Sequence, residues 1–280
     1  MPSEHNTPRA PGAGAVAVTG SKGGVGKSNL AANLAVSLAR WGHRVLLVDG
    51  DLGLANIDVL LGLLPKSNID HVMHGDATLD DVLVTGPHGV RVLAAASGVP
   101  ELASIDPRAR ARLLSLLTQA SAEVDHLLID TGAGLGETTL ALQLAASSVV
   151  VVTTPEPTSL VDAYATLKVL WSADPRKNVE VVVNNVADDA EAVSAYEQIA
   201  KAAGHFLGQR PGWLGPVYRD AKVVEAVRRQ RCLMELFPDS AAGRCYDRIA
   251  LRLTLADRAR TQCVEYWQKL MPPPDEEWVH

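Results

Sequence analysis

The stretch TGSKGGVGKSN, residues 19–29, decides the fold class because it joins an apolar run to a segment with helical periodicity. The run AVAVT (15–19) precedes it, and a predicted helix over 28–41 follows. Glycines in such a loop let successive backbone N–H groups converge on phosphate oxygens at the N-terminus of the helix. We therefore predict a phosphate-binding loop formed by Gly23, Gly24, Val25, Gly26, Lys27, Ser28 and Asn29.

The loop departs from the usual spacing GxxxxGK[ST] at one position. Residue 21 is a serine where that spacing expects the first glycine, and Lys22 stands five residues before Lys27. In a phosphate loop, Lys27 contacts the β- and γ-phosphates and the Ser28 hydroxyl binds Mg²⁺. A chance glycine-rich turn before a helix is the alternative. A phosphate-binding loop requires only one lysine, Lys27, so the loop pattern by itself does not explain the function of Lys22.

Six short runs rich in Val, Leu and Ile alternate with helical segments along the chain. Runs that are nearly all apolar are typical of strands buried on both faces of a parallel sheet. We predict one α/β P-loop domain over residues 14–257, with a mostly parallel, doubly wound sheet and helices on both faces. A disordered segment (1–13) would precede it, and a C-terminal helix with an acidic tail (258–280) would follow. The predicted strands lie at 15–19, 44–49, 90–95, 126–130, 147–154 and 179–185.

The composition argues against several other classes of protein. The net charge of −6 disfavours a surface that binds nucleic acid over its whole extent. The three cysteines (Cys232, Cys245 and Cys263) form no CxxC pair, so the pattern indicates neither a disulfide framework nor a metal-cluster carrier. No stretch is apolar over the length that a bilayer span needs. We expect a cytoplasmic protein.

Three aspartates lie at or just beyond the carboxyl ends of predicted strands, where ligands bind in open α/β sheets. Asp130 ends the run HLLID and is the candidate carboxylate for Mg²⁺. Asp49 and Asp51 lie in LLVDGD. We assign Asp51 to orienting the attacking water, and Asp49 to supporting the metal shell. Aspartates that only cap a helix or form a turn would look the same locally.

The segment VVVNNVAD (181–188) bears on the nucleotide base. Guanine-specific sites commonly use NKxD, whose aspartate accepts hydrogen bonds from guanine, but Ala187 stands at that position. The side chain of Asn184 carries both a donor and an acceptor and can pair with adenine. The sequence therefore predicts ATP, together with Mg²⁺, rather than GTP.

The segment KGGVGKS resembles the deviant Walker A motif of the MinD/ParA class of P-loop ATPases. More narrowly, VDGDLGLANIDVLLGL, IDTGAGLGETTL and TTPEPTSLVDAYATLK are similar to the flagellar-number regulators FlhG and FleN. This resemblance implies a slow ATPase that forms a homodimer on ATP binding and acts as a switch on flagellar number or placement. A MinD-type division-site ATPase and a ParA-type partition ATPase, binding membrane or DNA, are the alternatives.

The resemblance also assigns the additional lysine. In this class the first lysine of the motif, here Lys22, reaches across a face-to-face dimer to the nucleotide of the other subunit. Its charge would stabilise the transition state as an arginine finger does, which makes Lys22 a catalytic candidate beside Lys27 and Asp51. By the same resemblance, Glu156 and Asp162 lie at the dimer face, near the partner's ribose and the signature lysine respectively.

Partners are indicated by the same subfamily. Its members often begin with a DQAxxLR segment that stimulates an FlhF-type GTPase, and residues 1–14 contain nothing like it. This argues against that GTPase and leaves other flagellar regulatory proteins, such as a transcriptional activator, as candidates.

Two surfaces could meet lipid or DNA. The segment DRARTQCVEYWQKLM aligns Val264, Trp267, Leu270 and Met271 on one helix side. It predicts peripheral contact with the inner membrane or the cell pole, although a helix packed on the domain has the same pattern. Residues 219–260 hold ten Lys or Arg against six Asp or Glu. We interpret this excess as a solvated helix face rather than as a DNA-binding surface.

Overall fold

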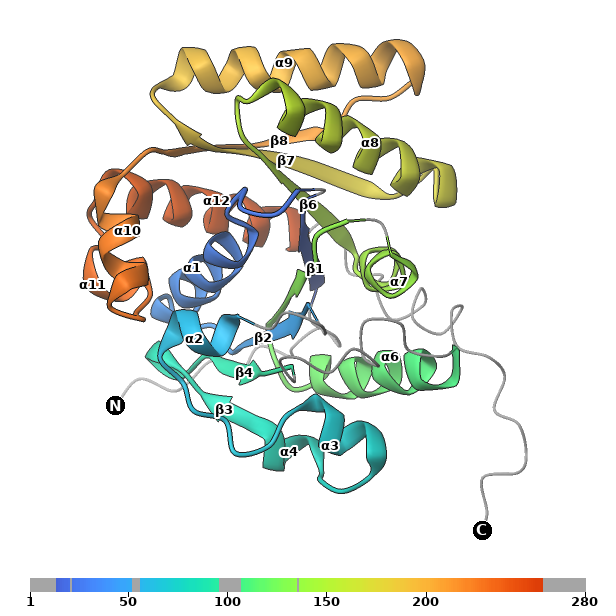
Figure 1. The fold of residues 1–280 in the computed structure, drawn as a ribbon, viewed down its shortest axis with the longest axis vertical. Coiled ribbons are helices and arrows are strands. Elements are labelled where there is room, and N and C mark those ends of the chain that lie inside the picture. Colours follow the sequence, from blue (N-terminus) through green and yellow to red (C-terminus); the bar gives the residue numbers. More distant parts are fainter. Residues whose placement is uncertain (1–13, 21, 52–55, 96–106, 135, 259–280) are drawn as a thin grey trace, which may run out of the picture.

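The computed structural model describes residues 14–20, 22–51, 56–95, 107–134 and 136–258. An eight-stranded sheet with the order β3-β4-β2-β5-β1-β6-β7-β8 forms its centre (Figure 1). All pairings are parallel except that of β3 with β4, which confirms the predicted fold class. The strands are β1 (Gly14–Thr19), β2 (Val45–Gly50), β3 (Leu83–Thr85), β4 (Arg91–Leu93), β5 (His126–Thr131), β6 (Ser148–Thr153), β7 (Asn178–Val186) and β8 (Gly212–Tyr218).

Helices cover both faces of this sheet (Figure 1). They are α1 (Lys27–Arg40), α2 (Ile57–Leu61), α3 (Ile69–His74), α4 (Leu79–Val82), α6 (Pro107–Ser121), α7 (Glu137–Ala145), α8 (Pro157–Ala173), α9 (Asp189–Phe206), α10 (Ala221–Arg228), α11 (Leu233–Leu236) and α12 (Ala241–Arg258), with a 3-10 turn η1 (Pro87–Gly89). Strand β1 shows the division of the core. Ala15 and Ala17 belong to the cluster with α6, α7, α8 and α9, whereas Val16 and Val18 belong to the cluster with α1 and α12. The alternation confirms the doubly wound arrangement.

Two strands, β3 and β8, were not among the predicted runs. Strand β8 has the sequence GWLGPVY, and its two glycines and one proline are residues that strands usually avoid. It pairs only with β7 and therefore lies at the edge of the sheet, where proline is tolerated. Strand β3 has three residues and lies at the opposite edge. Because β8 contains glycine and proline and β3 is short, neither strand forms the long apolar run by which the other strands were predicted.

The predicted limits of the domain stay predictions. Residues 1–13 lie outside the described residues, as does the chain beyond Arg258. Within the described ranges, no helix has the length and apolarity needed to cross a membrane.

The register of the central strands brings the predicted site residues to one edge. Asp49 of β2 is the register partner of Asp130 of β5, and Asp130 is also the partner of Val18 in β1. The loop that follows β1 therefore begins beside both aspartates. This edge holds the carboxyl ends of the parallel strands, where open α/β folds bind ligands.

Candidate nucleotide site

The phosphate loop ends at Gly26, which is the N-cap of α1. Its φ of 94° is in the left-handed region, which favours glycine. A Cβ atom on Gly26 would lie 2.2 Å from Nδ2 of Asn184. Helix α1 has no side-chain hydrogen bond at its N-cap, so its first N–H groups can serve a phosphate. The local structure thus provides the predicted anion cradle, and its contacts with a nucleotide stay predictions.

Lys27 is the first residue of α1, and only 8% of its surface is exposed. A buried lysine needs an anionic partner to offset the loss of hydration. Its charge lowers the pKa of Asp130, against the larger effect of burial. A Cβ atom on Gly20 would lie 3.2 Å from Cδ of Lys27, so the stem of Lys27 packs against the start of the loop. The side chain is held in the loop by packing and by charge.

Asp130 and Ser28 meet at the site that was predicted for Mg²⁺. Burial raises the pKa of Asp130 to about 7, while a hydrogen bond from the Ser28 side chain opposes that rise. The Oδ1 atom of Asp130 is buried and has no hydrogen-bond partner in the described part of the chain. A divalent cation would supply the missing partner, so these residues fit Mg²⁺.

The described residues include no group of three or more His, Cys, Asp or Glu side chains arranged to hold a metal ion. In P-loop enzymes Mg²⁺ takes one or two protein ligands and completes its shell with phosphate oxygens and water. The assignment of Ser28 and Asp130 to the ion, with Asp49 in support, stays a prediction.

The carboxylate of Asp49 accepts backbone hydrogen bonds that could not be predicted from its place in the sequence. Its Oδ1 accepts a hydrogen bond from the backbone N–H of Asp51 at 3.1 Å. Its Oδ2 accepts from the N–H groups of Asn56 and Ile57 at 2.9 and 3.1 Å. Burial raises the pKa of Asp49 to about 6, and these three bonds oppose the rise. The carboxylate thus fixes both ends of the chain between Asp51 and α2, and its predicted support of the metal shell stays a prediction.

Asp51 lies against the loop that follows β5. A Cβ atom on Gly132 would lie 3.2 Å from Oδ1 of Asp51, so a larger residue there would crowd this carboxylate. The charge of Asp51 raises the pKa of both Asp49 and Asp130. The structure therefore brings the three predicted carboxylates into one electrostatically coupled group. A carboxylate so placed can accept a proton or orient a water molecule.

Asn184, at the carboxyl end of β7, contacts the phosphate loop directly. Its Nδ2 donates a hydrogen bond of 2.8 Å to the carbonyl oxygen of Val25. One of the two N–H donors of the amide is therefore used within the protein, and this bond fixes the direction of the amide. Oδ1 is the acceptor of this amide, and an acceptor suits the exocyclic amine of adenine.

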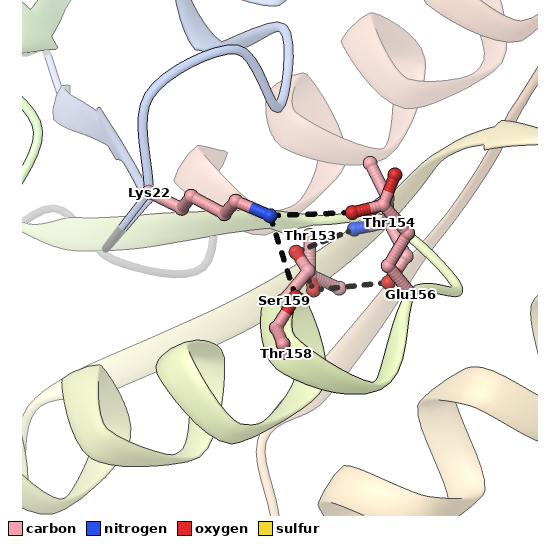
Figure 2. Close-up of polar contacts among 6 residues, drawn as sticks. All are labelled: Lys22, Thr153, Thr154, Glu156, Thr158 and Ser159. Atoms are coloured by element: carbon pink, nitrogen blue, oxygen red, sulfur yellow. Dashed lines mark hydrogen bonds and ion pairs between the residues drawn. The ribbon is translucent and has the colours of Figure 1, made fainter.

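Lys22 makes its contacts within its own chain (Figure 2). Its Nζ lies 3.3 Å from Oε2 of Glu156 and 3.3 Å from Oγ1 of Thr158, at the start of α8. Within the single chain Lys22 thus pairs with Glu156, and the places that the resemblance gives Glu156 and Asp162 at a dimer face stay predictions. Ser159 fixes the same turn, because its Oγ contacts Oγ1 of Thr153 and accepts from the N–H of Thr154 (Figure 2).

Sequence reasoning missed a buried polar contact beneath the loop. Nε2 of Gln143 in α7 donates a hydrogen bond of 2.7 Å to Oγ1 of Thr19, the last residue of β1. Both side chains are fully buried. The hydrogen bond connects α7 to the end of β1, where the phosphate loop begins. A single glutamine within the apolar helix segment TTLALQLA was the signal that could have revealed it.

The described cysteines are core residues. Cys232 and Cys245 are free and buried. Burial raises the pKa of Cys232 to about 12, and its Sγ lies 2.8 Å from Oδ1 of Asn33. Because metals bind the thiolate form, this environment disfavours Cys232 as a ligand. Cys263 lies outside the described residues.

Comparisons with known proteins identify the family of this chain. The ParA family model, described as NUBPL iron-transfer P-loop NTPase, matches residues 13–253. The antiactivator FleN of Pseudomonas aeruginosa is 40% identical over 85% of this chain and 85% of its own length. The flagellum site-determining protein YlxH of Helicobacter pylori is 34% identical over 84% and 80%.

Two solved structures have the same fold. The septum site-determining protein MinD of Pyrococcus horikoshii, complexed with Mg-ADP, gives a TM-score of 0.74 at 24% identity and covers 87% of this chain and 97% of that one. MinD in the MinC:MinD complex of Aquifex aeolicus gives 0.72 at 26% identity, over 86% and 96%. The predicted family is confirmed, and the chain belongs to the MinD/ParA family of P-loop ATPases.

Proposed function

We propose that this chain is an ATP-dependent switch that dimerises around two ATP molecules, hydrolyses them slowly and regulates flagellar number or placement. The similarity to FleN and YlxH extends over at least four fifths of each chain, which supports the flagellar role. The relative FleN is named an antiactivator, so a transcriptional activator is the class of partner that we favour. The output of such a switch is a shift between monomer and dimer.

Each residue of the site has a proposed part in hydrolysis. Lys27 and the N-terminus of α1 bind the phosphates, and Asn184 binds the adenine. Mg²⁺, held by Ser28 and Asp130, would neutralise phosphate charge when it is bound. Asp51 orients the attacking water, and Asp49 fixes the backbone that carries Asp51. We thus propose that each step other than activation uses groups of one subunit.

We propose that Lys22 stimulates ATP hydrolysis when the dimer forms. The main observation behind this proposal is the contact of Lys22 with Glu156. The side chains of this ion pair are 43% and 65% exposed. Ion pairs this exposed contribute little, because water screens them. The phosphates of a second subunit's ATP can therefore compete for the lysine. A lysine that rests on its own subunit and moves across the dimer links hydrolysis to association.

Lys22→Ala tests this part of the proposal. We expect the variant to bind ATP with the affinity of the natural chain, because Lys27 and the α1 N-terminus remain, and to lose the stimulation of hydrolysis at high protein concentration. The measurement is ATPase rate against protein concentration, with light scattering to follow the dimer. Lys201→Ala, which removes an exposed lysine from α9, is the matched control. Full activity of Lys22→Ala as a strict monomer would refute the role.

The cellular role is tested in a strain that lacks the protein. We expect flagella in abnormal number or at abnormal places, restored by the natural chain and not by Lys22→Ala. Counting and locating flagella by electron microscopy gives the result. Normal flagellation with misplaced septa or lost chromosomes would instead support the division-site or partition roles.

DNA binding is not part of the proposal. Several of the basic side chains at residues 219–260 have acidic partners on the same helix or in the next turn. Lys222 and Arg229 both pair with Glu225, and Arg231 pairs with Glu235. These pairs are typical of a solvated helix face. The segment that predicted membrane contact, beyond Arg258, lies outside the described residues.

A further inference from the structure

We propose that Asn185 and Arg219 form a positioning pair that fixes Asn184 and so sets the preference for adenine over guanine. The inference rests on the proposed ATPase function but concerns the base rather than the phosphates. Neither residue is assigned to the base by its own position in the sequence. Three features of the described residues support the pair.

The first feature is the restricted orientation of Asn184. One N–H of its Nδ2 donates to the carbonyl oxygen of Val25, which fixes the direction of the amide and hence of its acceptor, Oδ1. An acceptor at that place matches the amine of adenine and opposes the carbonyl oxygen of guanine at the equivalent position. Discrimination then depends on keeping the side chain in this orientation. If Asn184 could rotate, its amide could offer the donor to guanine.

The second feature is a bulge at Asn185. In the pairing of β7 with β8, Asn184 faces Val217 and Val186 faces Tyr218, so Asn185 is the additional residue. Its φ is 60°, and it is one of three residues other than glycine with a positive φ in the described ranges. Bulges redirect neighbouring side chains and are frequent beside active sites. The bulge therefore sets the direction in which Asn184 leaves the sheet.

The third feature is the set of hydrogen bonds that Arg219 makes with the bulge. Its Nε donates to Oδ1 of Asn185 at 3.3 Å, and its Nη2 lies 3.5 Å from the carbonyl oxygen of the same residue. Its own N–H donates to the carbonyl oxygen of Val186 at 2.8 Å. Asp220 follows, and it caps α10 by accepting from the N–H of Lys222. Arg219 is thus held between the sheet and a helix start, and it holds both the side chain and the backbone of Asn185.

Four variants distinguish the effect of the left-handed backbone at Asn185 from the effect of its contact with Arg219. Asn185→Asp keeps an acceptor for Arg219 and tolerates the left-handed backbone. Asn185→Gly keeps the backbone alone, and Arg219→Ala removes the contact alone. Asn185→Ala loses the contact and disfavours the backbone. The quantity to measure is the ratio of the Kd for GTP to the Kd for ATP, by titration calorimetry with Mg²⁺ on the full chain.

We expect the ratio to fall about tenfold in Asn185→Ala, the effect of one hydrogen bond. Asn185→Asp should keep the ratio of the natural chain, and Asn185→Gly and Arg219→Ala should give intermediate ratios. Arg176→Ala, an exposed arginine in the connection between α8 and β7, is the control and should change nothing. Melting temperatures report whether each variant folds.

Unchanged ratios in a folded Asn185→Ala and in Arg219→Ala would overturn the inference. Arg219 is exposed, so the second variant remains informative if the first does not fold. A natural chain that binds ATP and GTP equally would also overturn it, while leaving the switch intact. A natural chain that binds neither nucleotide would refute the proposed function itself.

Discussion

Replacing Lys27 by alanine is expected to abolish measurable ATP binding, with an affinity at least about a hundredfold lower, because a phosphate loses its buried cation. Lys27 is 8% exposed, and no water can take the place of its charge at low cost. Titration calorimetry with ATP and Mg²⁺ measures the effect. The loss should exceed that of any other single substitution in the loop that leaves the backbone intact.

Two further variants separate charge from packing. Lys27→Met keeps the apolar stem that packs against Gly20 and removes only the charge, so it should bind ATP as poorly as the alanine variant. Lys201→Ala removes an exposed lysine and should bind normally. If Lys27→Met bound ATP as tightly as the natural chain, the assignment of this loop to phosphates would be wrong.

Local patterns were sufficient to predict most of the sheet and the phosphate loop. The strands β1, β2, β5, β6 and β7 are buried on both faces, so their runs of Val, Leu and Ile stand out from the amphipathic helices between them. The chemistry of the loop is equally local. Glycines, a lysine and a serine at the start of a helix must be neighbours in sequence to act together.

Contacts between distant residues could not be predicted in the same way. The partner of Lys22 is 134 residues away, and the partner of Asn184 is 159 residues away. The family resemblance gave Lys22 a place in the dimer, whereas the single chain pairs it with Glu156. Likewise, Asp49 could be seen in the sequence, but its three backbone partners depend on how the chain returns to α2.

Asp51→Ala is expected to bind ATP but to hydrolyse it at least about a hundredfold more slowly, the usual contribution of a group that takes part in proton transfer. Binding should persist because Asp51 holds neither phosphate nor metal in the proposed site. Its charge also raises the pKa of Asp130, so its removal relieves repulsion at the proposed Mg²⁺ site. Single-turnover hydrolysis and titration calorimetry separate the two effects.

A stalled ATPase that still binds ATP must change its oligomeric state if hydrolysis is what returns the dimer to monomers. We therefore expect Asp51→Ala to accumulate as a dimer with ATP in size-exclusion light scattering. Asp239→Ala, an exposed carboxylate before α12, should remain active and reversible. A variant at Asp51 that stays monomeric with ATP and still hydrolyses it would show that this residue does not orient the water. The combination of tight binding, slow hydrolysis and stable dimer is specific to the proposed role, because loss of the fold would remove binding and loss of the dimer face would leave only monomer.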